Sequence, residues 1–139
     1  MLFKDCLCFQ VGRVSRKMTK VTREKVAPYG LTTTQFFLLS ALYEGDGVLI
    51  SALAGKVALD KGTLTGLLDR LERDDLIERR ADSSDRRAIR IFLRQKAEGL
   101  RDELTEIYHE NNAYFLSLLT EEEKSVFERV VEKLETVDL

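Results

Sequence analysis

The most informative segment of the sequence for the fold is residues 60–74, which read DKGTLTGLLDRLERD. Its leucines follow the i, i+3, i+4, i+7 spacing of an amphipathic helix, so one stripe is expected to be buried. Asp60 belongs to the residue types that cap helices well, which predicts a helix from there to about Asp74. The opposite face carries polar or small residues: Lys61, Thr63, Thr65, Gly66, Asp69, Arg70 and Arg73.

A shorter helix is expected just before this one, at residues 51–58, after a short β-branched strand at residues 48–50. A short helix, a tight turn and an amphipathic helix that starts with small polar residues form the layout of a helix-turn-helix. The second helix of that layout enters the major groove of DNA. Residues 60–74 are therefore predicted to be a recognition helix.

The segment after the recognition helix changes from a helical to an alternating pattern. Residues 76–80 and 88–93 flank the sequence DSSDRR at 82–87, whose Asp and Ser side chains are typical of turns. We predict a β-hairpin with a basic tip over residues 76–93. A hairpin in this position is the wing of a winged helix-turn-helix.

Two helices are expected before this core. Apolar residues three or four apart predict a helix over residues 3–27, which Pro28 and Gly30 end. Thr32 and Gln35 have the spacing of a capping box, so a second helix starts there. The dense apolar content of residues 36–42 predicts that this second helix is largely buried.

Two helices are also expected after the wing, over residues 95–118 and 120–136, the second capped by a box of Thr120 and Glu123. The fold class is therefore mostly α with a small β-hairpin, in one domain over residues 1–139. Apolar stripes on terminal helices need a partner surface beyond a small winged core. We predict that residues 3–30 and 95–139 form a homodimer around a DNA-binding core at 31–94.

The charge distribution points to a polyanion. The net charge of the chain is −2, but residues 79–96 carry +5 within an acidic neighbourhood that ends with −8 over residues 97–139. A short basic island of this kind is either a nucleic-acid contact or an ordinary solvated face. The helix-turn-helix beside it favours DNA.

Several other classes are excluded by what the sequence lacks. No apolar run reaches the roughly 20 residues of a membrane span, and the N-terminus is amphipathic and basic, so a cytoplasmic protein without membrane contact is expected. Cys6 and Cys8 are too few for a disulfide framework, and His109 has no Cys or His neighbours for a metal site. No phosphate loop or nucleophile elbow occurs, so we expect neither an enzyme nor a cofactor.

Taken together, the motifs resemble the MarR family of winged-helix transcription regulators. The matching pieces are DKGTLT at 60–65, LDRLE at 68–72, LIER at 76–79 and DRR at 85–87, in the family's order and spacing, and the resemblance covers essentially all of the chain. It implies a dimeric regulator, typically a repressor, on a pseudo-palindromic DNA operator. It also implies release by an effector, either a small aromatic molecule or an oxidant.

The resemblance and the wing together assign candidate DNA contacts on the recognition helix and the hairpin tip. Arg87 is expected to enter the minor groove, steered by a hydrogen bond that Asp85 accepts, and Arg86 to meet a phosphate. The resemblance also implies an architectural ion pair between Asp69 and Arg79, although two separate solvated charges are the competing interpretation. The candidate contacts are Lys61, Thr63, Thr65, Arg70, Arg73, Ser83, Ser84, Arg86 and Arg87.

The chain departs from the family pattern at three places. Asp75 replaces the usual glycine after the recognition helix, but Asp tolerates the left-handed conformation that the turn needs. Gly66 replaces a larger and often basic residue, which removes one candidate base contact. Arg94 replaces a threonine cap and offers either a phosphate-reaching cation or no contact at all.

The segment Leu7-Cys8-Phe9 resembles the sensing segment of the organic-hydroperoxide-responsive branch, in which oxidation of a cysteine releases DNA. In that branch tyrosines partner the thiolate, whereas the matching positions here are Gly12, Thr22 and Thr33. Cys8 is thus a possible redox sensor without its usual donors, or a small buried apolar side chain. A second alternative concerns the whole chain: a winged-helix protein-interaction module that does not bind DNA.

Overall fold

The computed structural model describes residues 2–137. Met1, Asp138 and Leu139, which the predicted domain includes, lie outside the described residues. The chain divides after Ile107 into two compact units, and the boundary falls within one helix.

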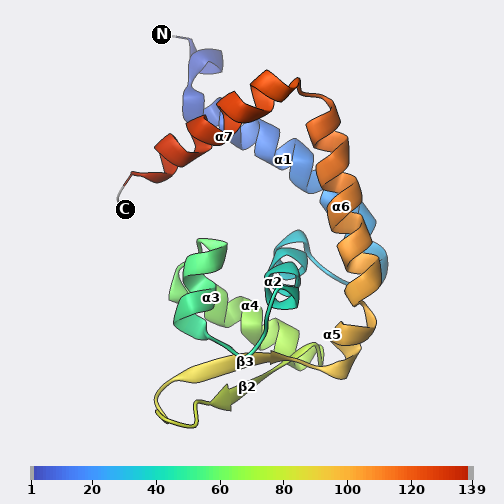
Figure 1. Cartoon of the computed structure of the whole chain (residues 1–139), viewed down its shortest axis with the longest axis vertical. Helices are drawn as coiled ribbons and strands as arrows, with labels where there is room; N and C mark the ends of the chain where they lie inside the picture. The colour runs from blue at the N-terminus through green and yellow to red at the C-terminus, as the bar shows by residue number, and fades with distance from the viewer. Residues whose placement is uncertain (1, 138–139) are drawn as a thin grey trace. The chain divides into compact units, whose positions relative to one another are not determined.

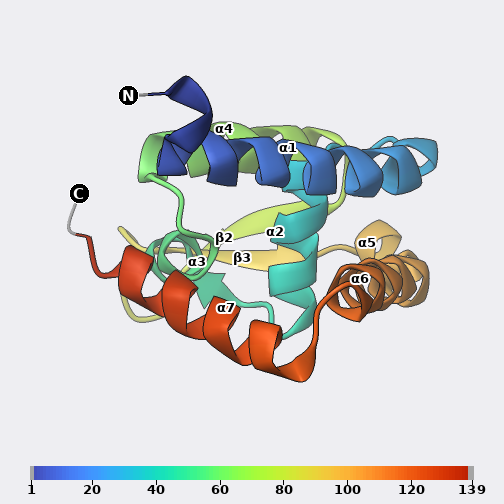
Figure 2. The ribbon, with the colours of Figure 1, turned by 90° about the horizontal axis from the view of Figure 1, so that it is seen from above.

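The first unit contains the whole winged helix-turn-helix. Helices α2, α3 and α4 lie on one side of a small antiparallel sheet (Figure 1), and α2 passes over strands β2 and β3 in the view from above (Figure 2). Its elements are η1 (Phe3–Asp5), α1 (Leu7–Val26), η2 (Ala27–Tyr29), α2 (Thr33–Tyr43), β1 (Val48–Leu49), α3 (Ile50–Val57), α4 (Lys61–Arg73), β2 (Ile77–Ala81), β3 (Ile89–Leu93) and α5 (Gln95–Gly99). The next helix, α6 (Arg101–Ser117), begins in this unit.

The sheet has three strands in the order β1-β3-β2, all antiparallel. The hairpin places Arg79 opposite Ile91, and Ile91 also faces Val48 of β1. The predicted strand and the predicted wing are therefore both confirmed. The sequence did not reveal that they belong to one sheet, because two residues of β1 carry no signal of their partner.

The core of the first unit lies between the sheet and the helices. The recognition helix α4 buries Leu64, Leu68 and Leu71, as the leucine spacing predicts. Helix α2 is buried along most of its length, and Gln35 completes its capping box with Thr32. The other buried apolar residues are Val26, Leu31, Phe36, Leu38, Leu39, Leu42, Leu53, Ala54, Leu76, Ile77, Ile91, Ala97 and Leu104.

The prediction of one helix over residues 95–118 is wrong, because the helix is interrupted at Leu100, which separates α5 from α6. Contacts with α2 accompany the break: the Tyr43 hydroxyl donates to the Ala97 carbonyl at 2.6 Å, and Arg101 Nη1 donates to the Tyr43 carbonyl at 2.9 Å. Burial of this hydroxyl raises the pKa of Tyr43 to about 12. The pattern of apolar residues could not reveal contacts with a helix more than 50 positions away.

The predicted helix over residues 3–27 also differs from the structure, in which the α-helix begins at Leu7 and ends at Val26. A short 3-10 turn, η1, precedes α1, and Cys6 is the N-cap residue between them. Gly30 ends the following turn η2 with φ of 70°, a left-handed conformation that glycine adopts without strain. Only Thr22 and Val26, near the C-terminal end of α1, are buried.

The second unit comprises the C-terminal half of α6 and helix α7 (Glu121–Glu135). The predicted capping box at the start of α7 is confirmed: the Thr120 hydroxyl accepts from the Glu123 amide, and the Glu123 carboxylate accepts from the Thr120 amide. No residue of α7 is buried. Among residues 2–137, no helix combines the length and apolar content needed to cross a membrane.

Candidate nucleic-acid interface

The start of the recognition helix is held by Asp60. Its Oδ1 accepts from the Thr63 amide at 2.8 Å and its Oδ2 accepts from the Thr63 hydroxyl at 2.7 Å. These hydrogen bonds lower the pKa of the Asp60 carboxyl, which stays charged at neutral pH. The Thr65 hydroxyl donates back to the Lys61 carbonyl at 2.7 Å. Both threonine hydroxyls thus use their protons within the helix and offer lone pairs outward.

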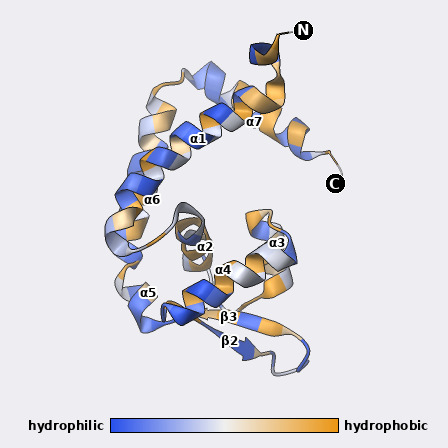
Figure 3. Cartoon of the chain, turned by 180° about the vertical axis from the view of Figure 1, so that it is seen from behind, coloured by the Kyte–Doolittle hydropathy of each residue, from blue (hydrophilic) through white to orange (hydrophobic). Residues whose placement is uncertain are grey.

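The outward face of α4 is available to a ligand. The candidate contacts Lys61, Thr63, Thr65, Arg70 and Arg73 are all exposed. A Cβ atom built at Gly66 meets nothing within 4 Å, so this position is open space on the same helix. Figure 3 shows hydrophilic colour at the C-terminal end of α4 and on β2. Within residues 2–137, the contacts of these side chains in the fold are the two threonine hydrogen bonds described above and an ion contact of Arg73 with Asp74.

The Asp69–Arg79 pair expected from the family resemblance forms, and it has a third member. Arg79 Nη2 lies 2.5 Å from Asp69 Oδ1 and 3.1 Å from Glu72 Oε1. The Arg79 amide also donates to Glu72 Oε2 at 3.0 Å. The hydrogen bonds from Arg79 lower the pKa of Glu72. Sequence reasoning missed Glu72, although its i+3 spacing from Asp69 places both carboxylates on one helix face.

Replacing Arg79 with methionine is expected to lower the free energy of unfolding by about 1–2 kcal/mol, because two neighbouring carboxylates lose their shared cation. The matched control is Arg73→Met, which removes the same charge from an arginine that is 73% exposed and whose Nε lies 3.8 Å from Asp74 Oδ1. That control is expected to change stability by less than about 0.5 kcal/mol. Urea unfolding of both variants measures the difference, and equal midpoints would contradict the architectural role.

The wing tip presents the exposed side chains of Ser83, Arg86 and Arg87. The expected hydrogen bond between Asp85 and Arg87 exists, but it differs in kind: Asp85 Oδ1 accepts from the Arg87 backbone amide at 2.9 Å. Asp85 therefore shapes the turn and leaves the guanidinium to point outward. The Ser84 hydroxyl, a candidate contact, donates to Asp82 at 2.5 Å.

The turn between α4 and β2 accommodates its departure from the family pattern. Asp75 has φ of 64°, the left-handed conformation that the substitution for glycine requires. Arg94, where the family usually has a threonine cap, forms an ion pair with Asp75, and its guanidinium lies 3.5 Å from Glu78 Oε2; its contact with a phosphate stays a prediction. Arg94 thus joins the end of the wing to the turn after the recognition helix.

Both cysteines are exposed, so the interpretation of Cys8 as a small buried side chain is wrong. Cys8 lies in the first turn of α1 and Cys6 is its N-cap residue. The positions that match the family's tyrosines include Thr22 and Thr33, which are buried. Within residues 2–137, no His, Cys, Asp or Glu side chains are grouped as a metal site would require.

A helix-turn-helix followed by a basic wing, with an outward helix face free of core contacts, defines a winged-helix DNA-binding protein. Residues 31–89 match the MarR family. The regulator MgrA of Staphylococcus aureus is 36% identical over 103 residues, which cover 73% of this chain and 70% of MgrA. The regulator TtmR of Methylorubrum extorquens is 34% identical over 103 residues, which cover 74% of this chain and 53% of TtmR.

Solved structures agree with these sequence matches. The S. aureus MepR–DNA complex superimposes with a TM-score of 0.86 and 26% identity, covering 94% of this chain and 97% of MepR. Overoxidised AbfR bound to DNA superimposes with a TM-score of 0.77 and 28% identity, covering 93% of this chain and 90% of AbfR.

The chain belongs to the MarR family and is a DNA-binding transcriptional regulator, not an enzyme. The fold and the recognition from sequence motifs are thereby confirmed. Family membership favours DNA binding over the alternative of a protein-interaction module.

Proposed function

We propose that the chain is a homodimeric repressor that binds a pseudo-palindromic operator. The observation that carries this proposal is the shared exposure of the α4 face and the basic wing tip, which leaves both for DNA. In this proposal residues 31–94 contact DNA, while residues 3–30 and 95–139 form the dimer interface. Lys61, Thr63, Thr65, Arg70 and Arg73 face the major groove, and Ser83, Ser84, Arg86 and Arg87 serve the wing.

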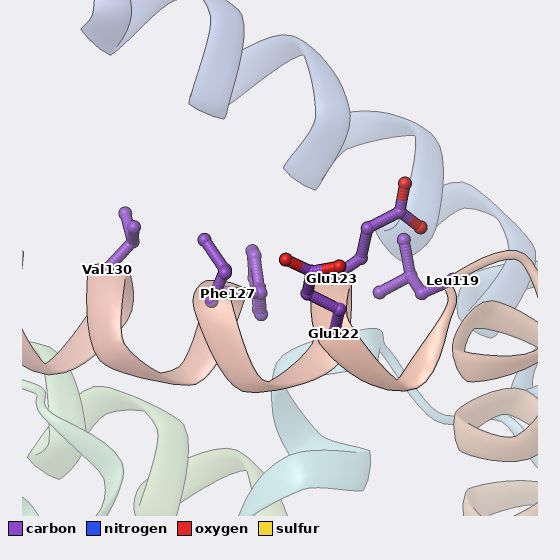
Figure 4. Close-up of a pocket in the computed structure, with 6 residues that line it drawn as sticks. Leu119, Glu122, Glu123, Phe127 and Val130 are labelled. Atoms are coloured by element: carbon purple, nitrogen blue, oxygen red, sulfur yellow. The ribbon is translucent and has the colours of Figure 1, made fainter.

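The dimer is supported by apolar residues that are exposed on two helices, α1 in the first unit and α7 in the second. On α1, Leu7, Val11, Val14 and Met18 alternate steps of four and three, the spacing of a helix–helix seam. On α7, Val126, Phe127, Val130 and Leu134 are exposed. Figure 4 shows Phe127 and Val130 on one side of α7 and Leu119 just before the helix; together with Val126, Glu122 and Glu123 they line an open pocket. Contiguous exposed apolar faces of this kind favour an interface.

A two-fold dimer sets the geometry of the operator. Its two recognition helices would lie about 34 Å apart, one turn of B-DNA, so that each enters the major groove on the same side of the duplex. Half-sites related by an inverted repeat would then make the same contacts with each copy.

Selection of bound duplexes from a random-sequence pool tests the proposal. We expect an enriched inverted repeat with half-site centres about 10 base pairs apart. Affinity for that duplex is expected to fall steeply with salt, because each phosphate contact releases counterions. A pool without enrichment, or enrichment of a single unrepeated half-site, would contradict the proposal.

Release by an effector completes the proposed repression. A small aromatic molecule or an oxidant would bind or modify the dimer. It would thereby shift the population to a state in which the spacing of the two recognition helices fits DNA poorly. Such a population shift requires that the effector has a higher affinity for that state. AbfR has been solved in a reduced and in an overoxidised form, both bound to DNA, which supports an oxidant as one candidate effector here.

Oxidation of Cys8 is expected to have a weak effect on DNA binding. Thr22 and Thr33 stand at two of the positions where the peroxide-sensing branch has tyrosines, and both are buried, so the thiol lacks those donors. We expect slow and incomplete release of the selected duplex by organic hydroperoxide. The response should be lost in Cys8→Ser and retained in Cys6→Ser. Fast, complete release at low peroxide would show that the missing tyrosines do not matter.

A further inference from the structure

The wing contains a buried carboxylate that no DNA contact explains. The side chain of Asp82 is 9% exposed, and it lies at the point where β2 ends and the wing loop begins. Its Oδ2 accepts from the Ser84 and Asp85 amides, each at 3.2 Å, and from the Ser84 hydroxyl at 2.5 Å. One carboxylate oxygen therefore fixes the first half of the loop that presents Arg86 and Arg87.

The other oxygen of this carboxylate links the wing to the core. Asp82 Oδ1 accepts from Arg90 Nε across the hairpin, and Arg90 Nη1 donates to the Gly47 carbonyl at 2.6 Å. The hydrogen bond from the Ser84 hydroxyl and, to a smaller extent, the one from Arg90 hold the pKa of the Asp82 carboxyl far below its ordinary value. Asp82 and Arg90 are therefore both charged at neutral pH.

Gly47 is itself held firmly. Its amide donates to the Ile91 carbonyl at 2.7 Å, and its φ of 72° is a conformation that suits glycine. A Cβ atom at this position would lie 3.0 Å from the Phe92 ring, so any other residue would require the ring to shift. Next to it, Asp46 Oδ2 accepts from the Leu93 amide at 2.8 Å. The turn after α2 is thus hydrogen-bonded to β3 at Arg90, Ile91 and Leu93.

We propose that Asp82 and Arg90 are positioning residues that connect the wing loop to the turn after α2 and so hold Arg86 and Arg87 where they meet DNA. This inference rests on the proposed wing contact. Neither residue needs to touch DNA: Asp82 is negatively charged, and two of the guanidinium nitrogens of Arg90 are already used within the protein.

The direction in which one substitution changes the affinity for DNA distinguishes a positioning role from long-range electrostatics. Asp82→Asn removes a negative charge from a DNA-binding surface, so long-range electrostatics alone predicts tighter binding. Positioning predicts weaker binding, because an amide cannot form the same pair with Arg90 and accept all the loop hydrogen bonds. We expect about a tenfold loss of affinity for the duplex selected from the random pool.

A matched pair of substitutions tests the role of the Arg90 guanidinium. Arg90→Met and Arg80→Met remove the same charge from directly opposed positions of the hairpin. Arg80 is 60% exposed and packs on the Phe92 ring, 4.3 Å from its centroid, without a contact to Asp82. Arg90→Met is expected to weaken binding several-fold more than Arg80→Met. Circular dichroism at the assay temperature tests whether each variant is folded.

Two further readouts distinguish positioning from a general loss of structure. Exchange of the Ser84 and Asp85 amide protons should speed up in Asp82→Asn, while exchange in α2 stays unchanged. In a background carrying Arg86→Ala and Arg87→Ala, Asp82→Asn should have almost no further effect on affinity, because no wing arginine remains to be positioned.

The outcomes are distinct. If Asp82→Asn binds as tightly as the parent or more tightly, or loses the same factor in the double-alanine background, the positioning role is wrong. The proposed wing contact survives that result. If the double-alanine variant itself binds like the parent, the proposed wing contact fails, and the positioning role fails with it.

Discussion

The variant Phe127→Glu is expected to be a monomer that binds the operator about 10²- to 10⁴-fold more weakly than the parent. Phe127 is 60% exposed in the single chain and lies on the apolar face of α7. A carboxylate buried in an interface without a partner costs several kcal/mol, which is enough to separate the subunits. Two half-sites bound by one dimer also gain affinity from their linkage, and a monomer loses that gain.

The control for this variant is Ser125→Glu, which adds the same charge to the same helix. At about 100° per residue, position 125 faces away from the stripe of Val126, Val130 and Leu134, so the dimer should persist. Analytical ultracentrifugation measures the assembly and a duplex titration measures the affinity. Removing residues 120–139 altogether should give a monomer or an aggregate. A soluble dimer of unchanged stability after that deletion would refute the interface.

Substituting Arg87 with alanine is expected to weaken operator binding by about 1–3 kcal/mol, the scale of one good specific contact. The Arg87 amide is held by Asp85, so its exposed guanidinium extends from a shaped turn. A wing that follows the recognition helix reaches the neighbouring minor groove, where narrow A·T-rich steps concentrate negative potential. The loss should therefore be larger on the selected operator than on a scrambled duplex.

Arg86→Ala is the matched comparison, because it removes the same group from the adjacent exposed position. We expect a smaller loss that is equal on both duplexes, and a salt slope reduced by about one unit, as for a phosphate contact. Titrations at several salt concentrations measure both quantities. Small and equal effects of the two substitutions on both duplexes would mean that the wing is only a charged surface loop.

The parts of the fold that the sequence predicted correctly depend on near neighbours. The leucine stripe of α4, the Asp60 cap and the two capping boxes each involve residues within one or two helical turns. The break between α5 and α6 was missed because it accompanies contacts with Tyr43, which is distant in the chain. A pattern of apolar spacing contains no information about such contacts.

The candidate site also contains residues that the sequence predicted and residues that it did not. The outward residues of α4 and the wing arginines follow from their position in the motif, and their contacts with DNA remain predictions. Glu72 and Asp82 were overlooked, since an acidic residue near DNA suggests no contact with it. Their roles depend on Arg79 and Arg90, which lie seven and eight residues further along the chain, on strands of the hairpin.

The open space at Gly66 has a consequence for the evolution of this regulator. The buried leucines of α4 and its anchoring by Asp60 and Arg79 do not involve position 66. A mutation at position 66 can therefore introduce a long side chain without a steric clash, and loss of a mid-helix glycine removes a cost of about 1 kcal/mol. Target-site preference can then drift through single substitutions while the scaffold keeps its stability. Descendants of one such gene could acquire different sets of controlled promoters in few steps.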